Sequence, residues 1–319
     1  MKNTDKKLIV PASVRLGDTI AIVTPASAME SRYIDSLIEK LHNRGFKTKV
    51  MPHAYGNEFG TYPADDDKRL ADIMDAFKDS EVKAILCSRG GYGMVHLLPH
   101  LDADTILKNP KWFVGFSDIS DMHAYLHHLG VASMHGPMAA HIVDEPDNDT
   151  ATNLLFKYLS EGLPQKVEIA PHKYNHNGTA KGRLVGGNLL TLTGLAETPY
   201  DVLNACRNED AILFIEDVSE QIYAVERMLI RMHYAGILKN VKGLIIGQFN
   251  DYKDSKDFAC MEDMFHYWLE KWGYYSPKNN IPIVFNYPVG HVTENYPMPI
   301  SAMTTLTADD NGVTLRFEQ

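Results

Sequence analysis

Short apolar runs alternate with amphipathic segments through the first half of the chain. Five runs have the length and content of buried strands, at residues 18–26, 47–53, 82–88, 111–116 and 131–136. Between them, three segments repeat apolar residues at helical spacing, at residues 31–45, 65–77 and 118–130. Apolar strands that alternate with helices are typical of a parallel sheet covered on both faces. We therefore predict a Rossmann-like open α/β domain over residues 1–160.

The first of these helices has recognisable ends. Its apolar face consists of Ile34, Leu37, Ile38 and Leu41. Ser31 is placed to cap the N-terminus with its hydroxyl, and Gly45 is placed to end the helix. The pattern predicts an amphipathic helix bounded by these two residues.

The alternation is lost over residues 161–181, which are rich in Pro, Gly, Asn and His and are typical of a linker. Further strands are expected at residues 210–218, 241–249, 281–289, 301–308 and 312–318. The last two are expected to form a hairpin, and helices are expected at residues 221–236 and 257–273. This pattern predicts a smaller mixed α/β domain, rich in strands, over residues 182–319.

The composition is that of a globular protein. The 319 residues are 45% hydrophobic and 23% charged, which argues against a disordered, collagen-like or coiled-coil chain. The 31 Lys and Arg set against 41 Asp and Glu give a net charge of −10, so the chain lacks the basic face that nucleic-acid binding needs. No apolar run approaches the ~20 residues that cross a bilayer, and the N-terminus lacks the pattern of a signal peptide. We expect a cytoplasmic protein that binds neither nucleic acid nor membranes.

Neither a metal nor a disulfide is indicated. Cys87, Cys206 and Cys260 are an odd number without CxxC spacing, so we expect reduced thiols. His123 and His127 share a helical face, but the segment HAYLH lacks the glutamate of the zinc-peptidase motif H-E-x-x-H. We expect these histidines to pack or to lie on the helix surface, and we expect no cofactor.

The sharpest local signal lies where a strand ends at Phe116 and a helix follows Ser117. A serine at a strand-to-helix turn, two residues after Gly115, has the layout of a nucleophile elbow. Gly115 would let another backbone pass close, and the N-terminus of the helix favours negative charge beside Ser117. Ile119 departs from the general G-x-S-x-G form, which has glycine there. The alternative is that Ser117 merely caps the helix.

A glycine-rich segment, CSRGGYG, follows another strand, at the end where open α/β sheets bind ligands. Gly90, Gly91 and Gly93 free the backbone to present N–H groups to an oxyanion or to a carboxylate. The segment matches neither glycine motif for nucleotides, so nucleotide binding is poorly supported. Arg89 is a candidate partner of a substrate carboxylate. The alternatives are a tight structural turn and a structural salt bridge of Arg89.

A serine nucleophile needs a base, and the base needs an orienting acid. His291 follows a predicted strand and a glycine in a Pro-rich loop, from which a side chain can reach into a cleft. Glu216 and Asp217 end an apolar strand, where a carboxylate is costly unless it is paired. Pairing of Glu216 with a histidine would satisfy this requirement. The alternatives are a surface histidine, a salt bridge of Glu216 and helix capping by Asp217.

Taken in order, these segments resemble the LD-carboxypeptidase family of serine peptidases. The resemblance covers nearly the whole chain, through the blocks DTIAIVTPAS, VKAILCSRGGYG, LLPHLD, NPKWFVGFSDIS, HGPM, GRLVGGNLLTL, ILFIEDVSEQIYAVERML, GLIIGQF and PVGH. It implies a triad of Ser117 as nucleophile, His291 as general base and Glu216 as orienting acid. It also implies an oxyanion hole made by the backbone N–H groups of Gly91 and Asp118.

Members of this family typically release the terminal D-alanine of murein tetrapeptides in the cytoplasm. The resemblance thus implies a cofactor-free serine carboxypeptidase of peptidoglycan recycling. From the residues themselves, Arg89 and Gly90 are the candidate substrate contacts. A sister branch hydrolyses microcin C-type peptidyl adenylates, but the RGGYG segment resembles the carboxypeptidase branch more. Two alternatives of other kinds are a non-catalytic carboxylate-binding protein on the same fold and a hydrolase based on Cys87. The oligomeric state is open, with a homodimer as one possibility.

Overall fold

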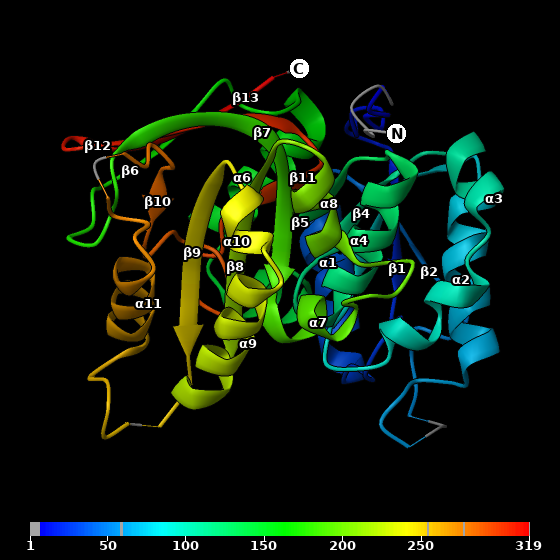
Figure 1. The fold of residues 1–319 in the computed structure, drawn as a ribbon. Helices are drawn as coiled ribbons and strands as arrows, with labels where there is room; N and C mark the ends of the chain where they lie inside the picture. The colour runs from blue at the N-terminus through cyan, green and yellow to red at the C-terminus, as the bar shows by residue number, and fades with distance from the viewer. Residues whose placement is uncertain (1–6, 58–59, 254, 277, 319) are drawn as a thin grey trace. The chain divides into compact units, whose positions relative to one another are not determined.

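Two units, each with its own β-sheet, make up the chain in a computed structural model. The model describes residues 7–318 except residues 58–59, 254 and 277. The N-terminal unit comprises residues 7–162 and 293–301, and the C-terminal unit comprises residues 163–292 and 302–318 (Figure 1). Residues 293–301 therefore fold with the N-terminal unit, although in sequence they lie between the two parts of the C-terminal unit.

The N-terminal unit is built on a mostly parallel sheet. Its strands are β1 (Thr19–Val23), β2 (Lys47–Val50), β3 (Val82–Cys87), β4 (Trp112–Gly115), β5 (Ser133–His135) and β11 (Met298–Ile300). They are ordered β11-β5-β4-β3-β1-β2, and β11 alone among these runs antiparallel. Every residue of β4 is buried, as expected for a strand covered on both faces, whereas the edge strand β2 alternates between exposed and half-buried residues. The five predicted apolar runs form the parallel strands.

Helices and short 3-10 turns connect these strands. The helices are α1 (Ser31–Asn43), α2 (Asp66–Lys78), α3 (Ala103–Lys108), α4 (Ser120–Leu129), α5 (Ala139–Asp144) and α6 (Thr150–Glu161). The turns are Met94–His96, Leu98–His100 and Ser117–Ile119. The sequence predicted α1, α2 and α4 but not the shorter α3 and α5, nor α6.

The predicted N-cap of α1 is wrong by one residue. Glu30 is the N-cap, in an extended conformation, and Ser31 is already helical, so its hydroxyl makes no capping bond. The other end is confirmed, because Gly45 follows the C-cap Arg44 with a φ of +87°.

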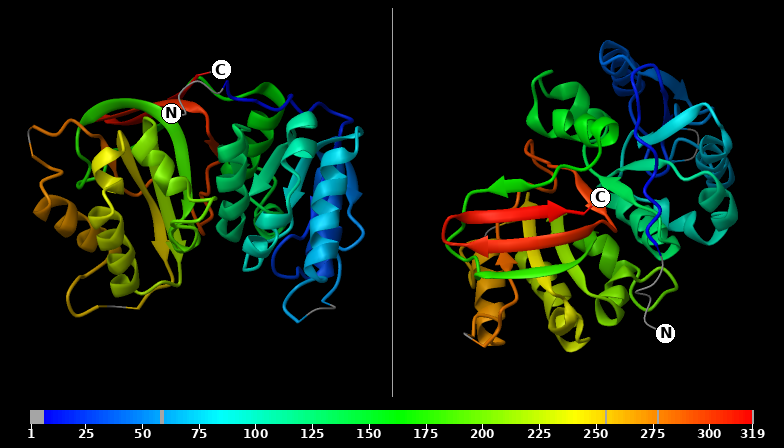
Figure 2. Two further views of the ribbon diagram at one scale, coloured as in Figure 1. Left: turned by 45° about the vertical axis from the view of Figure 1, so that its right-hand side comes forward. Right: turned by 90° about the horizontal axis from the view of Figure 1, so that it is seen from above.

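The C-terminal unit is built on a mixed sheet. Its strands are β6 (Val167–Ile169), β7 (Gly178–Asn188), β8 (Ala211–Val218), β9 (Gly243–Asn250), β10 (Ile283–Val284), β12 (Met303–Asp309) and β13 (Gly312–Phe317). The order is β10-β9-β8-β7-β12-β13-β6, parallel from β7 to β10 and antiparallel in the remainder. Figure 2 shows β7 in green beside β12 and β13 in red, and the predicted hairpin of β12 and β13 is confirmed.

The helices of this unit are α7 (Leu189–Gly194), α8 (Val202–Asn208), α9 (Ile222–Tyr234), α10 (Ile237–Asn240) and α11 (Met261–Lys271). The sequence predicted α9 and α11. Residues 161–181, expected to be a linker, contain β6 and the first residues of β7. The fold class is confirmed: a mostly parallel N-terminal sheet is followed by a mixed, strand-rich C-terminal part.

One predicted strand is much shorter than its apolar run. Of residues 281–289, only Ile283–Val284 form a strand, β10, which pairs with β9. Asn286 has a φ of +56°, and Pro288 has no N–H to donate, so the regular ladder ends there. Single backbone bonds to β9 persist, from the Tyr287 N–H to the Ile246 carbonyl at 3.2 Å and from the Gln248 N–H to the Val289 carbonyl at 2.9 Å. This departure from the sheet leads the chain to His291.

Candidate active site

Ser117 occupies a strained turn between β4 and α4. Its φ is +65°, in the left-handed region that residues other than glycine rarely adopt. Phe116 is the N-cap of the 3-10 turn that precedes α4, and no side chain caps that turn. The capping role that competed with a nucleophile is therefore wrong. A half-buried serine at a left-handed strand-to-helix turn has the backbone of a nucleophile elbow.

The glycine-rich loop lies directly against this turn. A Cβ atom added to Gly90 would lie 3.0 Å from Ser117 Cβ and 3.3 Å from the Asp118 nitrogen. Within the described part of the chain, neither the Gly91 N–H nor the Asp118 N–H donates a hydrogen bond. One of these backbone donors therefore belongs to the Ser117 turn, and the other belongs to the loop that lies against it.

Other predicted residues of this unit have structural contacts. Arg89 is exposed and donates to the Ala28 carbonyl at 3.0 Å, so the contact we find is a backbone bond rather than a salt bridge. Gly115 faces side chains rather than a passing backbone: an added Cβ would lie 3.0 Å from Ile119 and 3.2 Å from Cys87. The notion that Gly115 makes room for backbone is therefore wrong.

The histidines of α4 belong to the core. His123 is fully buried between the Ser133 hydroxyl and the Gly115 carbonyl, both 2.8 Å from its ring nitrogens. Burial lowers its pKa to about 4, so the ring is neutral. His127 bonds the Ser301 hydroxyl at 2.8 Å. The expectation that these two residues pack is confirmed.

Glu216 and His291 form a pair in the C-terminal unit. His291 Nδ1 lies 2.9 Å from Glu216 Oε2, and the imidazole donates because a carboxylate only accepts. The Glu216 side chain is fully buried, and that of His291 is 21% exposed. With its proton on Nδ1, the neutral ring carries on Nε2 the lone pair that a general base needs. The surface-histidine alternative is therefore wrong.

Local backbone features bring this pair together. The register of β8 against β9 shifts between Ile215 and Asp217, and such a bulge re-aims the side chain at that point. Gly290 has a φ of +133°, and an added Cβ would lie 3.1 Å from both Glu216 Cβ and Oε2. Only glycine lets the loop approach the strand this closely, so the sequence PVGH positions its histidine.

Neighbouring carboxylates raise the pKa of His291. Burial lowers the pKa of His291, but the Glu216 hydrogen bond and the charges of Glu216, Asp217 and Asp251 outweigh it, so the pKa is raised. Burial and the neighbouring Glu216 raise the pKa of Asp217 to about 6. Asp217 accepts from Asn188 Nδ2 and from the Leu190 N–H, both at 2.9 Å. It thus holds the first turn of α7, although it lies on β8.

Cys87 and a metal site are the other sources of chemistry considered from the sequence. Cys87 is fully buried at the end of β3, and burial raises the pKa of its thiol, which opposes thiolate formation. Among the described residues, no three His, Cys, Asp or Glu side chains group as metal ligands would. In the same part of the chain we find no helix with the length and apolarity that a bilayer crossing requires.

Comparison with known proteins identifies the family. Residues 20–136 match the LD-carboxypeptidase N-terminal domain, and residues 181–306 match the LD-carboxypeptidase C-terminal domain. A probable murein peptide carboxypeptidase of Bacillus subtilis is 30% identical over 95% of this chain and 93% of its own. The chain belongs to the LD-carboxypeptidase family. This is a family of serine peptidases.

Two further relatives represent its branches. A crystal structure of muramoyltetrapeptide carboxypeptidase from Oxalobacter formigenes matches with a TM-score of 0.81 and 28% identity, over 94% of this chain and 99% of its own. The microcin C7 self-immunity protein MccF of Escherichia coli is 26% identical over 75% of this chain and 78% of its own. The first is a muramoyltetrapeptide carboxypeptidase and the second is a self-immunity protein, so this chain is similar to proteins of both kinds.

Proposed function

We propose that the protein is a serine carboxypeptidase that releases the terminal D-alanine of murein tetrapeptides. The scissile bond joins the L-centre of a diamino acid to D-alanine. The observation that carries this proposal is the left-handed Ser117 turn in a chain of this family, with two backbone donors beside it. Identity is also higher to a murein peptide carboxypeptidase, 30% over 95% of the chain, than to MccF, 26% over 75%.

In the proposed mechanism, His291 takes the proton of Ser117 as the serine oxygen attacks the scissile carbonyl carbon. The backbone N–H groups of Gly91 and Asp118 receive the oxyanion. His291 then gives the proton to the leaving D-alanine amine, the carbon–nitrogen bond breaks, and an acyl-enzyme remains. Water deacylates it with the same base. Glu216 keeps the Nδ1 tautomer and stabilises the imidazolium.

Substrate recognition is proposed for the glycine-rich loop. Arg89 has five N–H donors and gives one bond to Ala28, so others can meet the terminal carboxylate of the peptide. Gly90 would form the wall beside it. We place this activity in cytoplasmic recycling of peptidoglycan, where short tetrapeptides are the substrate.

Mass spectrometry of purified murein tetrapeptide incubated with the protein tests the proposal. We expect loss of one D-alanine with wild type, and a kcat lower by about 10⁴–10⁶ in Ser117→Ala. Ser160→Ala is the matched control, because that hydroxyl only bonds carbonyls of its own helix, such as that of Phe156 at 2.8 Å.

Three outcomes would overturn the proposal. Preferred cleavage of a peptidyl adenylate would move the protein to the immunity branch. Tight peptide binding without turnover or fluorophosphonate labelling would favour a binding protein. The third outcome is a Ser117→Ala variant that keeps more than a tenth of wild-type activity. Such activity would be at least about 10³ times the expected residual rate, and it would exclude Ser117 as the nucleophile.

A further inference from the structure

A buried arginine and a buried aspartate hold one peptide group of the glycine-rich loop from opposite ends. We infer that Arg69 and Asp118 are positioning residues, which fix this loop so that its backbone donors meet the oxyanion at Ser117. The inference rests on the proposed function. We call Arg69, the peptide between Gly93 and Met94, and Asp118 the peptide clamp.

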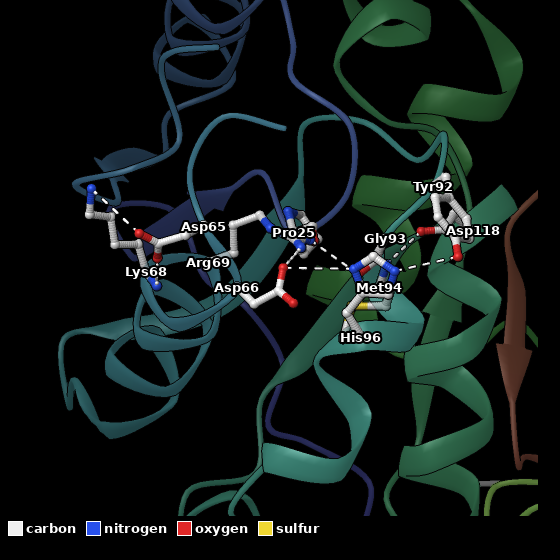
Figure 3. Close-up of polar contacts among 10 residues, drawn as sticks. All are labelled: Pro25, Asp65, Asp66, Lys68, Arg69, Tyr92, Gly93, Met94, His96 and Asp118. Atoms are coloured by element: carbon white, nitrogen blue, oxygen red, sulfur yellow. Dashed lines mark hydrogen bonds and ion pairs between the residues drawn. The ribbon is translucent and has the colours of Figure 1, made fainter. Parts of the chain in front are cut away.

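The two contacts converge on a single peptide bond. Arg69 Nη1 donates to the Gly93 carbonyl at 3.1 Å, and the next N–H, that of Met94, donates to Asp118 Oδ2 at 2.8 Å (Figure 3). The carbonyl and the N–H of a trans peptide point in opposite directions. A cation therefore lies at the negative end of this peptide dipole and an anion at its positive end. Flipping the peptide would break both hydrogen bonds. It would also turn the N–H toward the guanidinium and the carbonyl toward the carboxylate, which are both repulsive arrangements.

Burial makes the clamp strong. Arg69 is 1% exposed and Asp118 is 5% exposed. The guanidinium also binds the Pro25 carbonyl and the Asp66 carboxylate, and lies 4.5 Å from the centre of the Tyr62 ring. Polar groups buried in this way must keep their partners, because an unpaired one loses its hydration without replacement.

The loop needs such restraint because of its glycines. Gly93 has a φ of +121°, and an added Cβ would lie 2.6 Å from the Tyr62 ring and 3.1 Å from Arg69 Nη1. Glycine is therefore required for the guanidinium to approach. The same freedom makes peptide flips cheap in an unrestrained glycine loop. The clamp removes that freedom at the end of the loop nearest α4.

Ser27 restrains the other end of the loop. Its N–H donates to the Gly90 carbonyl at 3.1 Å, and its Oγ accepts from the Tyr92 N–H at 3.2 Å. Because the Gly90 carbonyl and the Gly91 N–H belong to one peptide, the Gly91 N–H points away from Ser27. Held at both ends, the loop presents this donor in one orientation.

The clamp also links the loop to the second donor. The side-chain carboxylate of Asp118 accepts from the Met94 N–H. In the proposed mechanism, the backbone N–H of the same residue is a donor of the oxyanion hole. The clamp thus joins segments that follow three adjacent strands: Pro25 after β1, Gly93 after β3 and Asp118 after β4. An oxyanion forms only as the reaction proceeds, so loosening the clamp should slow chemistry without weakening substrate binding.

The first test compares two substitutions of Asp118. Asp118→Asn keeps an oxygen that accepts from Met94, whereas Asp118→Ala removes it. We expect kcat for tetrapeptide cleavage to fall about 10- to 100-fold in Asp118→Ala, less than the ~10²–10³ of a donor removed outright. KM should change less than about threefold, and Asp118→Asn should keep at least about a third of kcat.

The matched control is Asp72→Ala. Asp72 is a buried carboxylate of the same unit that accepts from a backbone N–H, that of His53, at 2.9 Å, but it does not touch the loop. The Asp72→Ala variant should lower Tm, as Asp118→Ala does, but its kcat should stay within about twofold of the wild-type value. Rates are taken per active site titrated with a fluorophosphonate, so a loss of folded protein cannot imitate a loss of kcat.

Arg69 is tested by Arg69→Lys and Arg69→Met, read by the rate of fluorophosphonate labelling at Ser117. Labelling needs the nucleophile and the oxyanion donors but no particular peptide. We expect it to slow in step with kcat, more in Arg69→Met than in Arg69→Lys. In a Ser117→Ala background, Asp118→Ala should leave the Kd of the tetrapeptide within about twofold.

The outcomes separate this inference from the proposed function. A wild-type protein that neither labels nor cleaves would overturn both. A labelling wild type whose Asp118→Ala variant labels at an undiminished rate would overturn the peptide clamp alone. Equal losses of kcat in Asp118→Ala and Asp72→Ala would also overturn it, because general destabilisation would then explain the effect.

Discussion

Ser117 combines a strained backbone with a side chain that the fold does not use. Holding an L-residue in the left-handed region costs about 1–2 kcal/mol. No hydrogen bond of its hydroxyl in the described part of the chain offsets this cost. Backbone strain that no local interaction offsets is typical of a functional position, where the needs of activity and of stability conflict. This combination supports the proposed role of the Ser117 hydroxyl as the nucleophile.

Ser117→Gly should make this conflict measurable. Glycine relieves the left-handed strain of about 1–2 kcal/mol, and loses about 0.5–1 kcal/mol through greater freedom of the unfolded chain. We expect Ser117→Gly to be about 0.5–1 kcal/mol more stable than Ser117→Ala, with both inactive. Urea unfolding of both variants checks this difference. A less stable glycine variant would show that the turn is not strained.

The pH dependence of activity should report the Glu216–His291 pair. In the proposed mechanism His291 must be neutral to act as the base, so kcat/KM should rise with pH through the pKa of His291, which lies above its ordinary value of ~6.5. Glu216→Gln removes the hydrogen-bonded charge that raises this pKa. The rising limb should then move to lower pH, and the plateau should fall because the tautomer is no longer fixed. A pH–rate profile of both proteins measures the shift, and an unchanged profile would remove Glu216 from the triad.

At the scale of elements, Asp217 connects the acid of this pair to a neighbouring helix. It accepts from Asn188 Nδ2 and from the Leu190 and Val218 N–H groups, all at 2.9 Å. These bonds join the carboxyl ends of β7 and β8 to the first turn of α7. The backbone around Glu216 is thereby fixed by a residue that need not touch substrate.

Asp217→Ala should therefore destabilise the protein and move the pH limb. The buried Asn188 Nδ2 group would lose its Asp217 partner, which costs about 1–3 kcal/mol, and loss of the Asp217 charge lowers the pKa of His291. Asp201→Ala is the control: Asp201 accepts from the Asn204 and Glu197 N–H groups at 3.0 and 2.8 Å in the same unit. Both variants should lower Tm, but only Asp217→Ala should shift the limb of kcat/KM. A shift in both would contradict the assignment.

Two of the strands that escaped sequence-based prediction, β7 and β11, depend on neighbours that are distant in sequence. β7 contains four glycines and reads as a loop, because glycine is depleted in strands. Yet a Cβ added to Gly182 would lie 2.6 Å from the Asp210 carbonyl oxygen, so the neighbouring chain requires glycine there. β11 has three residues and pairs with β5, far away in sequence. Neither requirement is visible in a single segment.

Across the whole molecule, the role of a residue could be predicted where its neighbours in sequence indicate that role. It could not be predicted where the role depends on contacts that only the tertiary fold creates. The turn at Ser117 was predicted from a strand-to-helix boundary, although its positive φ was not, and a buried acid such as Glu216 calls for a partner. Arg69 gave no such signal, because an arginine in an amphipathic helix is ordinarily exposed. It is buried by Pro25, Tyr62 and Gly93, which only the tertiary fold brings to it.

Discrimination between a D- and an L-residue at the substrate terminus depends on several parts of the proposed site together. A carboxypeptidase that accepts a D-residue must hold the terminal carboxylate and the scissile carbonyl together. Inverting the α-carbon then moves the carboxylate from its donors or the methyl group into the wall of the site. A lost charge-assisted hydrogen bond costs about 1.5–3 kcal/mol, which exceeds the ~1.4 kcal/mol of a tenfold rate difference.

We therefore expect D-alanine to be released from L-lysine or meso-diaminopimelate tetrapeptides at least about tenfold faster than L-alanine from the matched diastereomer. Competition between the two diastereomers in one reaction, followed by chiral chromatography of the alanine released, measures the ratio directly. Arg89→Gln should reduce it, because the exposed guanidinium is the proposed carboxylate donor. Asp72→Ala should not, since that residue lies outside the loop. Equal rates would exclude a site that reads the terminal carboxylate, and with it the proposed roles of Arg89 and Gly90.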